Sequence, residues 1–380
     1  MTDVIVVGAG PVGTLLAAEL VRFGVTTALL ERRTESGAGT RAIGLHSPVL
    51  AALEPSGITE RLLAGAQRIP RGEARAGDRM LGVVRFDRLS TRFPFVAALP
   101  QSATEAALAA GAPQALRGAT VTAVTPGRAD VRVRYTIGGG LRELRAPIVV
   151  LAGGWASRPL AYRTLPVRIY ADRYLMADIP VGDRHDADVA VVNLTPGGVL
   201  ESFPLPGGMR RMVAWDRIAT PVGSTPAARA DRLRRALAAR GEAAAADAVT
   251  EATEFGVRRV VAPAMRRGRL FVIGDAAHEV SPIGGQGMNL GLLDAVTLAP
   301  LLAGWAATGI HPESQLAEWE RRRVSSATRA ARLAAINTAL GRPRGPAADA
   351  ARRGLVRAML APPLGRGFAS AYAMGLDADA

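Results

Sequence analysis

Cysteine is absent from this chain of 380 residues. Its absence excludes disulfides, thiolate nucleophiles and cysteine-ligated metals. Histidine is scarce as well, and the four that exist, at positions 46, 185, 278 and 311, lie too far apart in the sequence to indicate a metal site. We therefore expect neither a metal ion nor a redox-active thiol.

Lysine is also absent, so all 47 basic residues are arginine, against 33 acidic residues and a net charge of +14. A basic protein is a candidate for nucleic-acid binding. The arginines are scattered, however, as they are between residues 71 and 92, and neither a zinc-ligand spacing nor a nucleic-acid-binding aromatic motif accompanies them. This distribution argues against nucleic acid as a partner and favours attraction of an anionic cofactor or substrate.

Long, uninterrupted apolar runs are missing. The apolar stretch 290–306 is broken by Asp294 and Pro300, and it is shorter than the roughly 20 residues that cross a bilayer as a helix. The N-terminus lacks the basic region of a signal peptide. We therefore expect a cytoplasmic protein without a membrane partner.

The chain opens with a pattern typical of a nucleotide-binding turn, DVIVVGAGPVGTLLAAELVRFGVTTALLERR. Residues 4–7 predict a buried parallel strand, a helical pattern follows, and residues 27–30 predict a second strand. Between the first strand and the helix, Gly8 permits a tight turn, Gly10 lets a pyrophosphate approach the backbone, and Gly13 lets helix and strand pack closely. The helix N-terminus offers free N–H groups to the phosphates.

An acidic residue ends the second predicted strand. Glu31 stands where a carboxylate accepts hydrogen bonds from ribose hydroxyls. Its charge disfavours a 2′-phosphate, although the adjacent Arg32 and Arg33 offset that charge, and Arg32 is a further expected cofactor contact. This motif alone does not distinguish NAD from FAD.

A second pattern does distinguish them: GRLFVIGDAAHEVSPIGGQGMNLGLLDA, residues 268–295. An NAD domain needs no further nucleotide element so far downstream, whereas the ribityl chain and ring of FAD extend well beyond the dinucleotide turn. We expect an aspartate to bond the ribityl hydroxyls, and glycines to let the backbone approach the ring. A helix starting near Met288 would direct N–H groups at the ring edge. An ordinary strand–loop–helix crossover is the alternative. The expected contacts are Asp275, Gly285, Gly287, Met288 and Asn289.

With these residues the chain resembles a known family over residues 3–330, the FAD-dependent aromatic hydroxylases of the p-hydroxybenzoate hydroxylase type, or class A flavin monooxygenases. The segment GDAAHEVSPIGGQGMNLGLLDAVTLAPLL is similar to the second FAD motif of that family. TRAIGLHSPVLAALEPSGITERLL is similar to the segment that carries an FAD-contacting arginine, which places this role on Arg41. LPQSATEAAL is similar to the segment whose glutamine touches the cofactor, which places that role on Gln101.

The resemblance implies an α/β fold in which a Rossmann-like FAD-binding domain is interleaved with a smaller, mostly antiparallel β-sheet substrate domain, followed by C-terminal helices. The FAD-binding domain would comprise residues 1–70, 100–162 and 261–330. The substrate domain would comprise residues 71–99 and 163–260, and residues 331–380 would form the C-terminal helical segment. Within these parts, the Ala/Arg-rich stretch 226–248 predicts one helix packed outside the sheet.

The resemblance also implies an activity: hydroxylation of an aromatic or polyketide-like small molecule by O₂ through a flavin C4a-hydroperoxide, with NADPH or NADH as reductant. Arginine-only usage, typical of GC-rich genomes, suggests a role in antibiotic biosynthesis. Pro282 would lie at the flavin side of the pocket, with His46 nearby in a catalytic or merely structural role. Phe203, Met212 and Trp215 are candidates for the pocket wall.

Two other functions remain open at this stage. Flavin can serve without redox change as a scaffold for a cyclisation or rearrangement, and the protein can be a non-enzymatic carrier of flavin or another ligand. One departure from the family bears on this question. Relatives carry Asp-Gly after the strand equivalent to PIVVL and an arginine further on, whereas this chain has Gly153 and Leu160. We therefore expect direct reduction by NAD(P)H to be impaired, with a separate flavin reductase as one replacement, unless Arg158 fills the gap.

Overall fold

The computed structural model describes residues 2–35, 42–182, 184–216, 225–377 and 379. Its first sheet has the strand order β18-β19-β12-β1-β2-β8. All neighbouring strands are parallel except the edge pair β18–β19. The strands are β1 Val4–Val7, β2 Thr27–Glu31, β8 Leu116–Arg117, β12 Ile148–Leu151, β18 Arg266–Arg267 and β19 Leu270–Val272.

The central strands of this sheet are apolar runs buried on both faces, as a parallel sheet covered by helices requires. Strands far apart in the sequence become neighbours, because β12 lies between β1 and β19. The helices around this sheet and its loops are α1 Pro11–Arg22, α2 Ser47–Leu53, α3 Ile58–Ala64, α4 Gln101–Ala109 and α7 Gln286–Thr308. By length and composition α7 could cross a membrane, but 61% of its most apolar window is buried inside the protein, as in a core helix.

Two small sheets accompany the first. One is antiparallel, with the order β11-β10-β9, and the other joins β3, β7 and β4. The bounds are β3 Gly44–Leu45, β4 Gln67–Ile69, β7 Val96–Ala98, β9 Thr120–Pro126, β10 Val131–Ile137 and β11 Gly140–Ala146.

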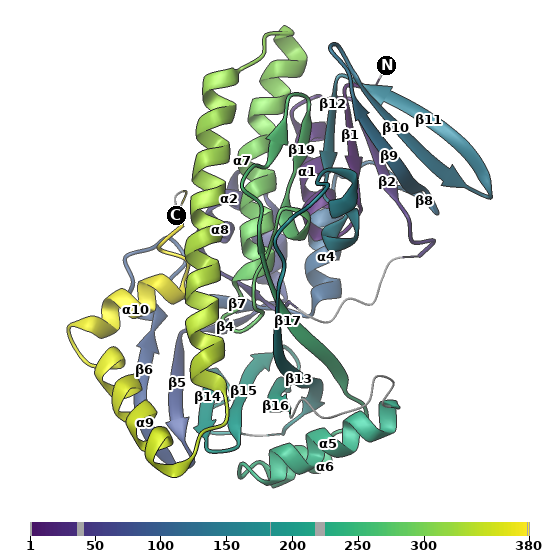
Figure 1. The fold of residues 1–380 in the computed structure, drawn as a ribbon. Helices are drawn as coiled ribbons and strands as arrows, with labels where there is room; N and C mark the ends of the chain where they lie inside the picture. The colour runs from purple at the N-terminus through teal and green to yellow at the C-terminus, as the bar shows by residue number, and fades with distance from the viewer. Residues whose placement is uncertain (1, 36–41, 183, 217–224, 378, 380) are drawn as a thin grey trace.

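The largest sheet has eight strands in the order β20-β17-β13-β16-β15-β14-β5-β6. It is antiparallel apart from the β14–β5 pair. Figure 1 shows it in the lower half of the molecule, below the parallel sheet. Its strands are β5 Arg71–Ala76, β6 Arg79–Arg85, β13 Arg168–Pro180, β14 Val189–Thr195, β15 Gly198–Leu205, β16 Met209–Asp216, β17 Thr253–Val261 and β20 His278–Glu279.

The two faces of the eight-stranded sheet are covered by different helices (Figure 1). On the outer face, α5 Pro226–Ala238 and α6 Ala243–Asp247 pack against alternate residues of β13, β15 and β16. The single helix expected over 226–248 is thus wrong: the chain turns at Gly241, whose φ of +83° interrupts the helix. The inner face meets α8 Glu313–Gly341, α9 Pro346–Leu360 and α10 Leu364–Tyr372.

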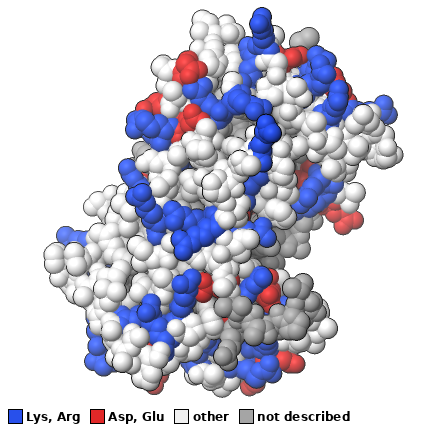
Figure 2. All heavy atoms as spheres, in the orientation of Figure 1, with Lys and Arg blue, Asp and Glu red and all other residues white. Residues whose placement is uncertain are grey.

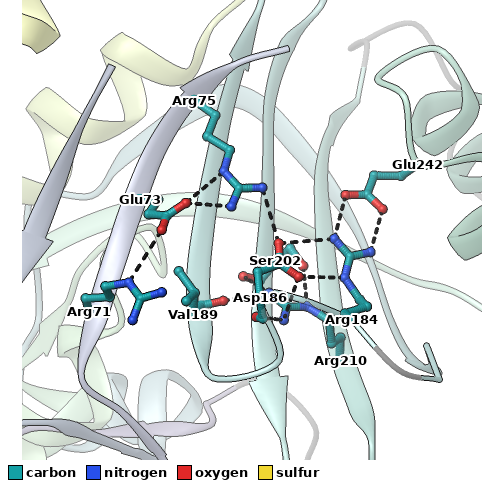
Figure 3. Close-up of polar contacts among 9 residues, drawn as sticks. All are labelled: Arg71, Glu73, Arg75, Arg184, Asp186, Val189, Ser202, Arg210 and Glu242. Atoms are coloured by element: carbon teal, nitrogen blue, oxygen red, sulfur yellow. Dashed lines mark hydrogen bonds and ion pairs between the residues drawn. The ribbon is translucent and has the colours of Figure 1, made fainter. Parts of the chain in front are cut away.

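A buried polar network occupies the part of the outer face toward β5 (Figure 3). Arg210, only 1% exposed, donates to Ser202 and to the backbone carbonyls of Asp186 and Val189. Asp186 also pairs with Arg184 and Arg75. Burial works against ionisation of Asp186, but these arginines hold the pKa of its carboxyl at about 2. The network therefore joins β5, the 184–189 turn and β16 through charged groups.

Candidate FAD-binding and catalytic site

The dinucleotide turn has the geometry that its glycines predict. Gly8 has a φ of +108°, and a Cβ there would lie 2.5 Å from the Cα of Gly153. A Cβ on Gly13 would overlap the carbonyl oxygen of Gly8. Gly10 differs, because no described atom lies within 4 Å of the position its Cβ would take. The turn is therefore closed on its protein side and open at Gly10, where α1 begins and a phosphate would approach.

Glu31 lies at the end of β2, directly beside this turn. Its carboxylate accepts hydrogen bonds from the Ala9 N–H at 2.7 Å and from the backbone and side chain of Arg33. Burial opposes ionisation, but these donors lower the pKa of Glu31 below its usual value. Arg32, predicted as a cofactor contact, is exposed, and its neighbour Arg33 pairs with Glu31.

The ends of three parallel strands meet at this turn. Gly153 follows β12 and lies against Gly8, while Gly274 follows β19 with a φ of +61°. A Cβ on Gly274 would lie 3.2 Å from the side chain of Val12 in α1, and one on Gly291 in α7 would lie 2.6 Å from it. The second nucleotide segment thus packs directly on the first. This packing explains why β19, although it comes late in the sequence, leads into Asp275 and the glycine-rich loop at the same site.

Asp275, the residue expected to bind the ribityl chain, is exposed at this edge. Its backbone carbonyl accepts a hydrogen bond from Arg158 at 2.7 Å, and the same guanidinium nitrogen pairs with Glu279 at 2.7 Å. Arg158 is buried and bridges the segment after β12 to the segment after β19. One guanidinium nitrogen serves both acceptors, and the Nε of Arg158 is buried without a hydrogen-bond partner among the described residues.

The glycine-rich loop 281–285 and the start of α7 are held by Asn289, which is fully buried. The side-chain oxygen of Asn289 accepts from the His46 N–H at 2.9 Å, and its nitrogen donates to the carbonyls of Gly44 and Gly285. Gly285 has a φ of +67° and precedes the first residue of α7, Gln286. The helix therefore starts two residues earlier than the sequence predicts. Asn289 contacts the loop through its side-chain amide.

The remaining loop residues differ in exposure. Met288 and Gly287 are half-buried in the first turn of α7, whereas Pro282 is exposed and its carbonyl accepts from the Gly285 N–H. His46 lies under this loop, its Nε2 3.7 Å from the position of a Cβ on Gly285. Burial lowers the pKa of His46 to about 4, so its imidazole is neutral near pH 7.

Gln101 begins α4 and lies across from the segment that leads to His46. Its side-chain oxygen accepts from the Ala42 N–H at 3.4 Å, and its nitrogen donates to Glu105. Gln101 is therefore close in space to the residue that follows Arg41. Arg41 itself lies outside the residues that the structure describes.

Two of the three candidates for the pocket wall lie on the inner face of the eight-stranded sheet. Phe203 of β15 and Trp215 of β16 point to the inner face. Met212 of β16 points to the outer face and packs against α5 and α6. The expectation for Met212 is therefore corrected, because neighbouring residues of a strand point to opposite faces. Trp215 packs on Gly198 and donates its indole N–H to Asp172 at 3.1 Å.

The C-terminal helices contribute residues that the sequence pattern did not single out. Gln286 donates to the backbone carbonyls of Ala371 and Tyr372 at the end of α10. The rings of Phe86 and Tyr372 lie 6.5 Å apart, so α10 also approaches the chain after β6. No local motif announces such contacts, because they join residues that lie far apart in the sequence.

The residues of this site fit FAD. The open N-terminus of α1 at Gly10 suits a pyrophosphate, and the Glu31 carboxylate beside it suits ribose hydroxyls. Asp275 is exposed at the same strand edge, and the positive-φ glycines 284 and 285 bring bare backbone to the surface of the loop beyond it. FMN would leave the first half of this arrangement unused, since it lacks the adenosine part.

Residues 1–334 match the model of the family described as FAD binding domain. Among curated proteins, the 6-methylpretetramide 4-monooxygenase of Streptomyces rimosus is 33% identical over 319 residues, which cover 79% of this chain and 55% of that protein. The chain thus spans little more than half the length of this relative.

Among solved structures, p-nitrophenol 4-monooxygenase PnpA from Pseudomonas putida DLL-E4 superposes with a TM-score of 0.85 at 22% identity, covering 98% of each chain. The Diels-Alderase PyrE3 of pyrroindomycin biosynthesis superposes with a TM-score of 0.78 at 23% identity, covering 98% of this chain and 80% of that one. At such identities these likenesses show the fold, and that fold serves two kinds of reaction. The family match, together with the dinucleotide turn and the second FAD segment, shows that this chain binds FAD and belongs to the FAD-dependent aromatic hydroxylases.

Proposed function

We propose that the protein is a flavin-dependent monooxygenase that hydroxylates an aromatic or polyketide-like small molecule. The observation that carries the proposal is the convergence of the dinucleotide turn with the segment that leads to Asp275, while Ile283 of the glycine loop packs on the inner face of the eight-stranded sheet. The named relative, a monooxygenase at 33% identity, supports the same reaction class. We place this activity in the cytoplasm, with O₂ and the aromatic substrate as partners.

Bound FAD, once reduced, would provide the chemistry that activates O₂. The chain would bind and orient the cofactor and the substrate and exclude water. The α1 N-terminus and Glu31 would hold the adenosine diphosphate, and Asp275 the ribityl chain. The loop held by Asn289 would face the ring edge, and the start of α7 would direct its partial positive charge there. Neutral His46 supports the loop from beneath and adds no charge to the site.

The deciding experiment uses the FAD-loaded protein, a candidate phenol and ¹⁸O₂. We expect consumption of reductant that depends on substrate, and one ¹⁸O atom in the product by mass spectrometry. An FAD-free sample of the same protein should incorporate none. Conversion of the substrate that continues without O₂ and without reductant would assign the protein to scaffold catalysis instead.

A second proposal concerns the source of electrons and rests on Gly153. We propose that NAD(P)H reduces this flavin poorly, because glycine offers no side-chain acceptor where relatives carry aspartate. A Cβ at position 153 would lie 3.0 Å from the Cβ of Ser157 and 3.2 Å from its hydroxyl oxygen, so an aspartate fits only if Ser157 yields.

The measurement is anaerobic stopped-flow bleaching of the flavin with NADH and with NADPH, in the presence of substrate. We expect slow bleaching by both nucleotides. The double variant Gly153→Asp with Ser157→Ala should bleach at least about 10-fold faster than Ser157→Ala alone, which corresponds to about 1.4 kcal/mol in the barrier. Rapid bleaching of the unaltered protein would contradict the proposal and remove the need for a separate flavin reductase.

A further inference from the structure

A buried acidic side chain lies within the inner face of the eight-stranded sheet. Glu201 stands in the middle of β15, directly opposite Val192 of β14 and Val213 of β16. Residues opposite one another share a face, and both valines belong to the apolar cluster that contains Ile283 of the glycine-rich loop. Glu201 is 3% exposed. Its carboxyl group therefore lies between the sheet and the loop expected to face the flavin.

Glu201 has no hydrogen-bond or ion-pair partner among the residues that the structure describes. The nearest arginines on this face have other partners. Arg211 forms a bidentate pair with Asp178, and Arg342 one with Asp172. A buried polar group without a partner lowers the stability of the fold. Packing alone thus gives no reason for an acid at this position, where a valine or leucine would suit the cluster.

Two tyrosines lie close enough to Glu201 for its charge to act on them. The negative charge of Glu201 adds to burial in raising the pKa of Tyr174 on β13 and of Tyr372 on α10, so both phenols are neutral at ordinary pH. The hydroxyl of Tyr174 is buried and has no hydrogen-bond partner within the described chain. The apolar cluster on the inner face thus lies around one acid, with the hydroxyl groups of two tyrosines within range of its charge.

Burial raises the pKa of Glu201 to about 8. The carboxyl group is therefore close to half-ionised under mildly alkaline conditions, and a hydrogen-bond donor brought to it would favour the ionised form. His46, the other buried titratable group of the site, is neutral there because its own pKa is lowered to about 4. Among the groups named here, Glu201 is therefore the one whose charge responds in that range.

We propose that Glu201 is the specificity-determining residue of the substrate pocket and accepts a hydrogen bond from a phenolic hydroxyl of the substrate. The proposal rests on the hydroxylase function proposed above, and it narrows the substrate class. A flat ring with a hydroxyl group satisfies both the apolar cluster and the acid. A ring that presents a carboxylate near Glu201 is repelled, because no described cation there is free of another acid.

The test measures binding to the FAD-loaded protein through the change in flavin absorbance. The probes are 2-naphthol and 2-methoxynaphthalene, in which a methyl group replaces the hydroxyl hydrogen and removes the donor. We expect the unaltered protein to bind the naphthol at least about 10-fold more tightly, which corresponds to about 1.4 kcal/mol, because only the naphthol can donate a hydrogen bond to Glu201. Its affinity should rise with pH as Glu201 ionises.

Three variants separate this role from a structural one. Glu201→Leu should lose the preference for the naphthol while keeping affinity for the ether. Glu201→Gln should keep part of the preference, because its amide oxygen still accepts, and lose the pH dependence. Glu73→Gln is the control, since Glu73 is a buried acid on the outer face of the same sheet, paired with Arg75. It should leave both properties unchanged.

Equal affinity of the two probes for the unaltered protein, or a preference that survives in Glu201→Leu, would overturn the proposal. Binding needs neither O₂ nor reductant, so this result is separable from the activity. A failed hydroxylase assignment would appear as no ¹⁸O in the product while the preference persists. If the assignment of Glu201 is wrong, the product will carry ¹⁸O, but the preference for the naphthol will be the same in Glu201→Leu as in the unaltered protein.

Discussion

Gly10 and Gly13 stand three residues apart in one turn, yet their surroundings differ. The space beside Gly10 is open, whereas a methyl group on Gly13 would overlap the Gly8 carbonyl. We predict that Gly10→Val weakens FAD binding by more than about 10-fold, with little change in the stability of the FAD-free protein beyond about 1 kcal/mol for the altered N-cap. Gly13→Ala should instead destabilise the FAD-free fold by about 1–3 kcal/mol.

Thermal unfolding of the FAD-free proteins and flavin titration of the folded ones check this pair. Equal loss of stability in the two variants would mean that the turn is equally crowded at both positions, contrary to the structure. The sequence motif predicts different roles for the two glycines, approach of a pyrophosphate at Gly10 and helix–strand packing at Gly13. The surroundings agree with that prediction, since the space beside Gly10 is open and the space beside Gly13 is filled.

His46 gives the fold a dependence on pH. Burial lowers its pKa from 6.5 to about 4, so between these values the unfolded chain binds a proton that the folded chain does not. Stability is therefore full above about pH 6.5 and falls as the pH is lowered toward 4. We predict that His46→Asn reduces this loss, measured as the difference in unfolding free energy between pH 7 and pH 5.

The control for that measurement is His185→Asn, because His185 is exposed. Its variant should keep the full acid sensitivity. An unchanged slope in His46→Asn would place the responsible group elsewhere. The sequence located His46 through the family resemblance but left its role open, since exposure and partners, on which the pKa depends, follow from the tertiary fold.

At the scale of elements, α7 and α8 are joined by a charged cluster within the core. Arg323 and Asp294, both 0% exposed, form a pair at 2.8 Å, and Asp294 also accepts from His278 and from the Gly274 N–H. Arg323 reaches Asp377 near the C-terminus as well. Burial alone would raise the pKa of Asp294, but His278 and Arg323 hold it below its usual value. The cluster thus connects the segment after β19 to the far end of the chain.

We predict that Arg323→Met destabilises the protein by about 3–5 kcal/mol, because it leaves Asp294 buried and without its cation. Arg321→Met, two residues away on the same helix, should change stability by less than about 0.5 kcal/mol, since Arg321 pairs with Glu318 at the surface. Chemical denaturation of both variants decides the matter. Similar midpoints would show that the buried pair contributes nothing beyond packing.

Elements with a strong periodic pattern were predictable from the sequence. The strands around residues 4–7 and 27–30 and the helix between them are present, because a buried run or an amphipathic repeat acts locally. The prediction of one helix over 226–248 was wrong at Gly241. The composition of this stretch favours a helix, but a turn at Gly241 divides it into two. Met212 was misassigned because strand register decides the face, and the boundaries of β15 and β16 were unknown.

For the whole molecule, the cofactor is the property that the sequence predicted best. Glycines at this spacing, followed by an acid at the end of the next strand, are typical of dinucleotide binding, and the family match confirms FAD. We predict that the purified protein is yellow and releases FAD on denaturation, and that added FAD at 100 times its Kd raises stability by about 2.7 kcal/mol. Chromatography of the released flavin is the check, and FMN as the sole flavin would contradict the assignment.

The whole-molecule charge does not mark a single binding surface. Figure 2 shows arginines spread over both halves of the visible face, with acidic groups among them. Many of these arginines take part in ion pairs within the chain, as Arg266 does with Glu313 and Arg232 with Glu254. The substrate, unlike the cofactor, was not readable from the sequence, because the residues that we propose to select it, with Glu201 first among them, come from separate elements.

The order of strands in the parallel sheet also affects how the protein is made. β1 is complete at Val7, but β12 must be inserted beside it before β19, which ends at Val272, can pair. At a synthesis rate of about 5–20 residues per second, β19 is complete roughly 13–53 seconds after β1. During that time the parallel sheet lacks β19 beside β12. Nascent chains arrested before β19 should therefore bind chaperones and fail to retain FAD, whereas chains arrested well beyond α8 should retain it.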